Sequence, residues 1–163
     1  IYEHEGTCYL RLGRGGEKRI HNKLENFQIG KAIKIQDGTK VAMFSTGAIF
    51  DQVQKACALL KDCGINPAVY TFPTVKPLDK DTVIKCAEEF DIIVTVEEHN
   101  VIGGFGSAVA EIMAEMPSPK GRLVKIGLND QYSSVVGSQD YLRDYYGMSA
   151  EKISARVKGV VGE

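Results

Sequence analysis

The apolar positions change their spacing beyond the first part of the chain, and the change predicts where a compact domain begins. Residues 17–30 are polar and irregular, which is typical of a linker. Residues 31–36, KAIKIQ, then alternate between apolar and polar side chains. Asp37-Gly38 is a strong hairpin signal, and residues 40–46, KVAMFST, supply a return strand. The pattern therefore predicts an antiparallel strand pair at the start of the domain.

Strands and helices alternate after this pair. Further strands are predicted at residues 67–72, 91–96 and 122–128, and helices at 47–63, from Asp79, from the glycines at 103–106 to before Pro117, at 138–146 and at 149–158. The run DIIVTV is continuously apolar, as expected of a strand covered on both faces. The expected fold is a three-layer α/β/α sandwich. Its five-stranded sheet is mixed and mostly parallel, with one antiparallel strand.

A second short strand, CYLRL at residues 8–12, precedes the linker and ends at GRGG. The chain starts at Ile1 and reaches this pattern within a few residues, so we interpret it as a piece of something longer. Arg11 and Arg14 stand in or beside the glycine-rich turn. Two guanidinium groups there could hold an anion by bidentate hydrogen bonds, and the alternative is solvent-exposed charge.

Composition and charge exclude some classes of partner. Apolar residues make up 44% of the 163 residues, and the formal net charge of −1 does not favour nucleic acid or an anionic membrane surface. No apolar run approaches the roughly 18 residues of a membrane-spanning helix. The four cysteines form no CxxC pair, which favours reduced thiols in a cytoplasmic protein over a metal or redox site.

The stretch TVEEHNVIGGFGSA at residues 95–108 carries the strongest candidate chemistry. Its glycines lack the third small residue of a dinucleotide-binding turn and do not directly follow the strand, which argues against a nucleotide. Glu97 and Glu98 are adjacent, so their side chains point to opposite faces of the strand and cannot share a proton. One histidine, His99, with one carboxylate is an incomplete metal site.

The remaining interpretation of this stretch is a connection built for close packing. Gly103, Gly104 and Gly106 allow positive φ angles and close backbone approach. Together with Glu98 and His99 they are expected in a crowded loop, either between domains or across a dimer axis.

Four motifs, in this order, resemble the transketolase family. They are YLRLGRG at residues 9–15, NFQIGKA at 26–32, TFPTVKPLD at 71–79 and TVEEHNVIGGFGSAVAE at 95–111. The first is similar to the end of the family's middle, pyrimidine-binding domain, and the second to the junction into its C-terminal domain. Together the motifs cover nearly the whole chain.

The resemblance implies that residues 1–25 are the tail of a pyrimidine-binding domain with its linker, and that residues 26–163 form a transketolase C-terminal domain. It also implies an α/β/α sandwich with one antiparallel strand. Complete members of the family bind thiamine diphosphate and Mg²⁺ between subunits. They transfer a two-carbon ketol unit between sugar phosphates in the pentose phosphate pathway. Arg14 matches the family arginine that grips the substrate phosphate.

The resemblance also implies what this chain lacks. The family's GDG-type metal motif and its activating glutamate are absent from the chain and belong upstream. We therefore expect the chain alone to bind neither cofactor and to be inactive. The expected partners are the remaining domains or an N-terminal subunit, in a homodimer or heterotetramer, together with sugar phosphates.

Three other functions stay open at this point. One is a free-standing α/β module that binds a nucleotide or another small molecule, and a second is a relative of deoxyxylulose phosphate synthase. The third is a non-enzymatic assembly subunit. The segment YLRLGRG favours the transketolase interpretation, because a self-contained module has no reason to begin with the last strand of another domain.

Overall fold

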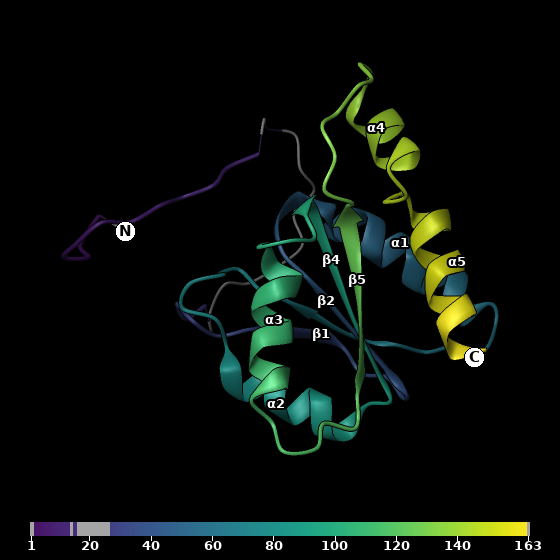
Figure 1. The fold of residues 1–163 in the computed structure, drawn as a ribbon, viewed down its shortest axis with the longest axis horizontal. Coiled ribbons are helices and arrows are strands. Elements are labelled where there is room, and N and C mark those ends of the chain that lie inside the picture. The colour runs from purple at the N-terminus through teal and green to yellow at the C-terminus, as the bar shows by residue number, and fades with distance from the viewer. Residues whose placement is uncertain (1, 14, 16–26, 163) are drawn as a thin grey trace.

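The computed structural model describes residues 2–13, 15 and 27–162, and within them a five-stranded sheet lies between two layers of helices (Figure 1). The strands are β1 (Ile33–Gln36), β2 (Val41–Ser45), β3 (Ala68–Thr71), β4 (Ile92–Asn100) and β5 (Arg122–Leu128). The helices are η1 (Gly47–Ile49), α1 (Phe50–Lys61), α2 (Lys80–Glu89), α3 (Phe105–Ala114), α4 (Gln139–Tyr145) and α5 (Ala150–Val161). The strand order is β1-β3-β2-β4-β5. β1 is antiparallel to β3 and the other neighbours are parallel, which confirms the predicted fold class.

The predicted hairpin is wrong, because β1 pairs with β3 and not with β2. The turn at Asp37 and Gly38 carries the chain across the end of β3. There the Thr39 N–H donates to the Asn66 carbonyl oxygen (2.8 Å), and a Cβ atom on Gly38 would overlap the backbone at Ala68. The glycine therefore serves a close approach between segments and not a two-residue hairpin. All four residues of β3 are buried, as expected of a strand that lies inside the sheet between two neighbours.

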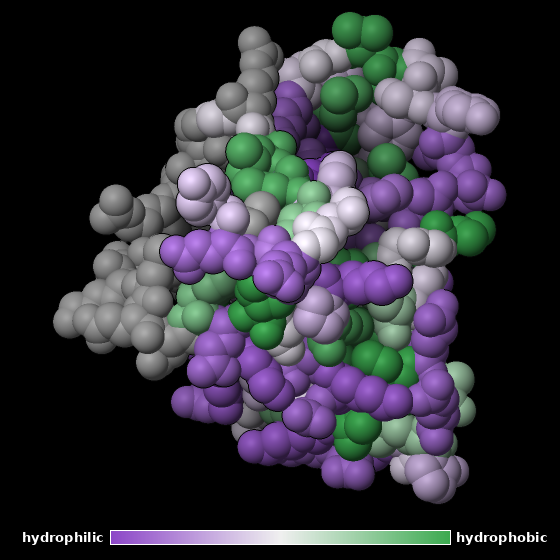
Figure 2. All heavy atoms as spheres, turned by 90° about the vertical axis from the view of Figure 1, so that its left-hand side faces the viewer, coloured by the Kyte–Doolittle hydropathy of each residue, from purple (hydrophilic) through white to green (hydrophobic). Residues whose placement is uncertain are grey.

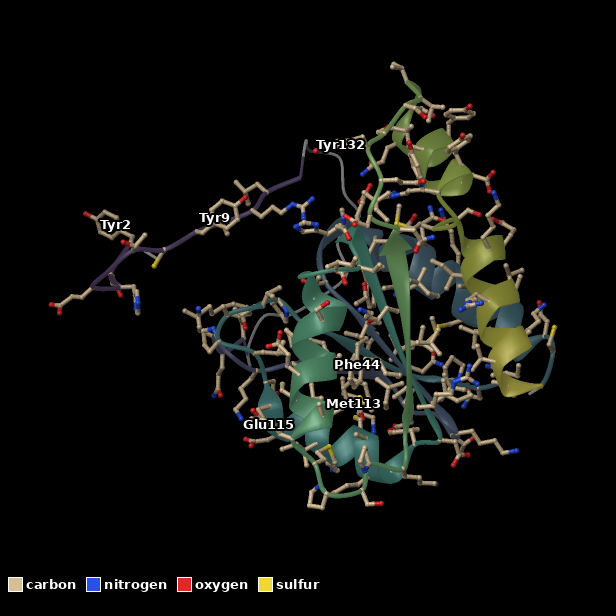
Figure 3. All side chains as sticks on the ribbon, viewed as in Figure 1. Tyr2, Tyr9, Phe44, Met113, Glu115 and Tyr132 are labelled. Carbon is tan, nitrogen blue, oxygen red and sulfur yellow. The ribbon has the colours of Figure 1, made fainter. Side chains whose placement is uncertain are left out.

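Alternating side chains divide the core into two halves, one on each face of the sheet. Met43 and Val94 face α1 and α5, whereas Phe44 and Ile93 face α2 and α3. Figure 3 shows Phe44 at the sheet with Met113 of α3 near it. Both faces of the central strands are thus covered, as the uninterrupted apolar run predicted.

Asp79 caps α2, as its sequence position predicted. Its carboxylate accepts hydrogen bonds from the Thr82 N–H (3.2 Å) and from the Ala32 N–H (2.8 Å), so it also ties the approach to β1 to the helix. Burial alone would raise the pKa of Asp79. The hydrogen bonds from Ala32 and Thr82, with the nearby charge of Lys31, outweigh that effect and hold the pKa below its usual value.

The N-terminal segment, residues 2–13, extends away from the sandwich (Figures 1 and 3). The strand predicted at residues 8–12 is wrong, because these residues pair with no strand among those the structure describes. Tyr9 and Leu12 are 88% and 76% exposed, so the apolar side chains that suggested a strand have no covering layer here.

Candidate functional site

The site that the sequence singled out lies where β4 ends and α3 begins. Glu97 points toward the α3 side of the sheet and is only 1% exposed. Its carboxylate accepts the N–H of Phe105 at Oε2 (2.6 Å) and the N–H of Gly106 at Oε1 (2.7 Å). The first N–H groups of a helix lack partners within the helix and form its positive end. Glu97 therefore caps α3 from the preceding strand.

The cap explains Gly104, and a neighbouring side chain explains Gly106. A Cβ atom on Gly104 would overlap the Glu97 carboxylate and the Asn100 carbonyl oxygen. A Cβ atom on Gly106 would lie 2.6 Å from Thr95 Oγ1, which is too close for a real contact. Gly103 has φ of +71°, a conformation that favours glycine. Close contacts within the chain thus account for Gly104 and Gly106, and the positive φ angle accounts for Gly103. Their predicted role at a subunit interface stays a prediction.

The Glu97 cap also argues against nucleotide binding at this turn. A pyrophosphate held by a helix N-terminus needs the exposed N–H groups of the first turn. Here the N–H groups of Phe105 and Gly106 already donate to Glu97. A diphosphate would have to displace a buried carboxylate, so the residues at this turn do not fit a dinucleotide or the diphosphate of thiamine diphosphate.

Glu98 points the other way, toward α4, as the alternation of a strand requires. Arg143 of α4 donates to its carboxylate from Nη2 (2.9 Å) and Nε (3.3 Å), and Gln139 donates from Nε2 (3.0 Å). The Arg143 side chain is only 7% exposed. A buried guanidinium is tolerated where a carboxylate and hydrogen bonds satisfy it, so this pair holds α4 across the end of β4.

His99 is exposed and does not join the two glutamates in one cluster. Its Nδ1 accepts a hydrogen bond from the N–H of Asn100 (2.6 Å). Across the described ranges, no group of three or more His, Cys, Asp and Glu side chains could hold a metal ion. The expectation that Mg²⁺ and thiamine diphosphate require other parts of the enzyme stays a prediction.

Asn100 is a structural residue that the sequence did not identify. Its side chain accepts the N–H of Ile102 (2.8 Å) and donates to Asp130 (2.9 Å). An asparagine that bonds the backbone two residues further on is typical of a turn, and this local signal could have revealed it. The bonds fix the loop between β4 and the glycines and connect it to the segment after β5.

Arg14, the predicted phosphate-binding residue, lies outside the described residues. Arg11 is described, and its Nη2 donates to the backbone carbonyl oxygen of Glu98 (3.3 Å). The structure thus joins the arginine segment to the end of β4, two features that the sequence treated separately. Arg143 was missed altogether, because no local pattern links it to a glutamate 45 positions earlier.

The sheet order, the antiparallel edge strand and the capped β4–α3 turn define an α/β/α domain like the one that the sequence motifs implied. The family model described as "Transketolase, C-terminal domain" matches residues 30–153. The chain therefore belongs to the transketolase family.

Three comparisons describe its relatives. A putative transketolase C-terminal section from Methanocaldococcus jannaschii is 36% identical over 159 residues, which are 96% of this chain and 49% of the relative. A 1-deoxy-D-xylulose-5-phosphate synthase from Heliobacterium modesticaldum is 37% identical over 154 residues, 93% of this chain and 24% of the relative. A solved structure described as a split gene transketolase, inactive beta4 tetramer, is 32% identical with a TM-score of 0.87, over 96% of this chain and 50% of that one. The chain thus spans about half the length of the first and third of these proteins. In the described part of the chain, no helix has the length and apolar character needed to cross a membrane.

Proposed function

We propose that this chain is the C-terminal portion of a thiamine-diphosphate-dependent transketolase. In the proposed division, residues 1–25 are the end of the pyrimidine-binding domain with its linker, and residues 26–163 are the C-terminal domain. The observation that carries the proposal is the likeness, over 96% of this chain, to half of a split gene transketolase. The complete enzyme transfers a two-carbon ketol unit between sugar phosphates in the cytoplasm.

Arg14 is the residue of this chain that we propose contacts the substrate. A planar guanidinium matches two oxygens of a phosphate, and a phosphate anchored far from the carbonyl helps to orient the reacting end. When bound, thiamine diphosphate supplies the stabilised carbanion that carries the two-carbon unit. The turn at Glu97 does not fit a diphosphate, so we assign the cofactor and Mg²⁺ to the portions that precede this chain or to a partner subunit.

The proposed partners are the remaining transketolase domains or a separate N-terminal subunit, in a homodimer or a heterotetramer. The exposed apolar side chains of the N-terminal segment support this proposal. Tyr9, Leu10 and Leu12 are each more than half exposed. On the face from which this segment projects, hydrophobic residues group between hydrophilic ones (Figure 2). Exposed apolar groups of this kind suit burial against another domain.

Comparing the chain alone with the assembled enzyme tests the proposal. Both are supplied with thiamine diphosphate, Mg²⁺, a ketose phosphate donor and an aldose phosphate acceptor, and ketol transfer is measured. We expect turnover in the assembled enzyme and none above blank for the chain alone. Turnover by the chain alone, or none by the assembled enzyme, would overturn the proposal.

Replacing Arg14 tests its role separately. Arg14→Ala should raise KM for phosphorylated sugars, with little effect on the affinity for thiamine diphosphate. Arg156→Ala, which removes an exposed arginine on α5, is the matched control. An unchanged KM in the Arg14 variant would make this residue an ordinary surface charge.

The 37% identity between this chain and a 1-deoxy-D-xylulose-5-phosphate synthase favours one alternative reaction, the formation of a 1-deoxyketose phosphate. The two activities differ in donor and product. Ketol transfer moves a hydroxyacetyl unit from a ketose phosphate and leaves a hydroxyl group on C1, whereas the deoxyketose lacks that hydroxyl and needs an acetyl unit, which a 2-oxo acid supplies with loss of CO₂. The assay is therefore repeated with a 2-oxo acid as donor. Mass spectrometry of the product distinguishes them by one oxygen atom. A deoxyketose product from the assembled enzyme would replace the transketolase proposal with this one.

A further inference from the structure

Helix α4 and the segment that precedes it carry an exposed aromatic surface. Figure 1 shows α4 beyond the ends of β4 and β5. Tyr132 and Val136 are almost fully exposed, and Tyr141 and Tyr145 are about half exposed. Contiguous exposed apolar groups on a soluble domain are typical of a site where another protein binds. These four residues are called the α4 surface below.

The rings of the α4 surface are ordered in the chain itself. Tyr146, which packs against the core, meets Tyr145 edge to face with ring centres 5.0 Å apart. Tyr145 and Tyr141 follow with ring centres 6.2 Å apart. The backbone at Gly137 lies against Tyr141, because a Cβ atom on this glycine would overlap the ring. Side chains that are already fixed lose little entropy on binding, so the surface is suited to contact another protein.

The attachment of α4 to the sandwich leaves its tyrosines on the outside. A helix of a soluble domain normally turns its apolar side to the core. In α4 the buried side chain is that of Arg143, which donates to the Glu98 carboxylate (2.9 Å), whereas Tyr141 and Tyr145 remain exposed. Seven residues are too few for a helix that is stable alone, so α4 depends on what it contacts.

The contacts at Glu98 indicate which partner covers the α4 surface. Arg11 belongs to the preceding domain in the proposed division, and its Nη2 donates to the Glu98 carbonyl oxygen (3.3 Å). The carboxylate of the same residue holds Arg143 of α4. Figure 3 shows Tyr132 at this end of the sandwich too. A small domain is roughly 30 Å across, so one that meets Glu98 reaches α4 as well.

Charge argues against a second copy of this chain as the partner. Asp130, Asp140 and Asp144 lie on the same helix and segment, and Arg143 and Lys152 offset only part of their charge. In a two-fold symmetric contact the α4 surface would meet itself, which brings these carboxylates near their own copies. Like charges across an interface disfavour the contact, whereas a partner with lysine or arginine around an apolar centre would fit.

We propose that the α4 surface docks the domain that immediately precedes this C-terminal domain. Tyr141 and Tyr145 lie at the centre of the contact, and the aspartates at its rim meet basic side chains of that domain. The inference rests on the proposed function, because the partner is the pyrimidine-binding domain of that proposal.

Photo-cross-linking in the complete enzyme tests the proposal. The photoreactive amino acid p-benzoylphenylalanine replaces Tyr141 in one sample and Leu59, an exposed residue on α1, in the control. On irradiation it joins to groups in contact with it, and mass spectrometry identifies the joined peptides. We expect position 141 to join a peptide of the preceding domain and position 59 to join none from that domain.

A second measurement needs no variant and therefore does not depend on how a variant folds. Tetranitromethane nitrates tyrosine rings that solvent can reach. In the complete wild-type enzyme, Tyr132 and Tyr141 should lose their reactivity, because the preceding domain covers them, and should regain it when the enzyme is unfolded.

Three results would overturn the inference. A product of two joined copies of this chain from position 141 would identify a second copy as the partner. The absence of any cross-link from position 141 to the preceding domain, or nitration of Tyr132 and Tyr141 as fast in the folded as in the unfolded enzyme, would show a surface that this domain does not cover. In an enzyme that transfers ketol units, these results leave the proposed function intact. A complete enzyme without ketol transfer would overturn the proposed function, whereas the cross-linked peptide would still identify what covers α4.

Discussion

Replacing the carboxylate of Glu97 by an amide should destabilise the domain although the side chain keeps its size. The carboxylate uses one oxygen for each of two N–H groups, those of Phe105 and Gly106. Glutamine has one oxygen and one NH₂ group, so one buried N–H in Glu97→Gln would face another donor. Because the volume hardly changes, the effect reports the cap and not a cavity.

The magnitude follows from two contributions. A buried N–H left without an acceptor costs about 1–3 kcal/mol, and the lost charge at the helix N-terminus costs roughly 0.5–1 kcal/mol more. The free energy of unfolding should therefore fall by about 2–4 kcal/mol. For a domain of this size the decrease corresponds to a Tm lower by roughly 5–15 °C.

Urea unfolding at neutral pH, followed by circular dichroism, measures this change. Glu111→Gln is the matched control, because it makes the same substitution at an exposed position on the same helix and should stay within about 0.5 kcal/mol of the wild type. If Glu97→Gln unfolds at the wild-type urea concentration, the carboxylate does not stabilise α3, and the explanation of Gly104 fails with it.

The remaining predictions concern a glycine, an aspartate and the cysteines. Gly104→Ala should lower the free energy of unfolding by about 2–4 kcal/mol, because its Cβ atom would displace the capping carboxylate. Gly159→Ala, in the last turn of α5 where an added Cβ atom meets no other atom, should raise the free energy of unfolding by up to about 0.5–1 kcal/mol. Thermal unfolding of both variants checks this, and equal Tm changes would contradict it. The pKa of Asp79 is lower in the folded than in the unfolded state, so its stabilisation is present above the unfolded value of roughly 3.9 and is lost as pH falls through the folded value. The difference in unfolding free energy between wild type and Asp79→Asn should thus be constant near neutral pH and shrink below about pH 4, and a difference that grows on acidification would refute this. Burial raises the pKa of the Cys57 thiol to about 12, and Cys86 is also buried, so an aromatic disulfide reagent should titrate two thiols in the folded chain and four after unfolding.

Most of the fold could be predicted from the spacing of apolar residues, because the pattern reflects which faces of each element are buried. The run from Ile92 to Val96 is apolar except for Thr95, and all five residues are buried because helices cover both sides of β4. The pairing of β1 could not be predicted in this way. An Asp-Gly turn is a local signal, whereas the insertion of β3 between β1 and β2 depends on packing between segments 26 to 38 residues apart.

The candidate site was predictable only in part. Strand alternation correctly separated Glu97 from Glu98, but it could not show that Glu97 reaches a helix that begins eight residues later. The partnership of Glu98 and Arg143 spans 45 positions with no repeating pattern between them, so it is visible only in three dimensions. The proposed role of Arg14 rests on the motif alone, because this residue lies outside the described part of the chain.

The carboxylate at the start of α3 has a consequence for how this domain can evolve. Open α/β sheets commonly acquire ligand sites at the ends of their central strands, where new specificities arise by small changes in loops. Here the Glu97 carboxylate occupies that location, so a variant that freed the helix N-terminus for a phosphate would first lose the stability that this cap contributes, about 2–4 kcal/mol. New ligand sites are therefore expected away from this turn, in loops whose residues do not cap a helix.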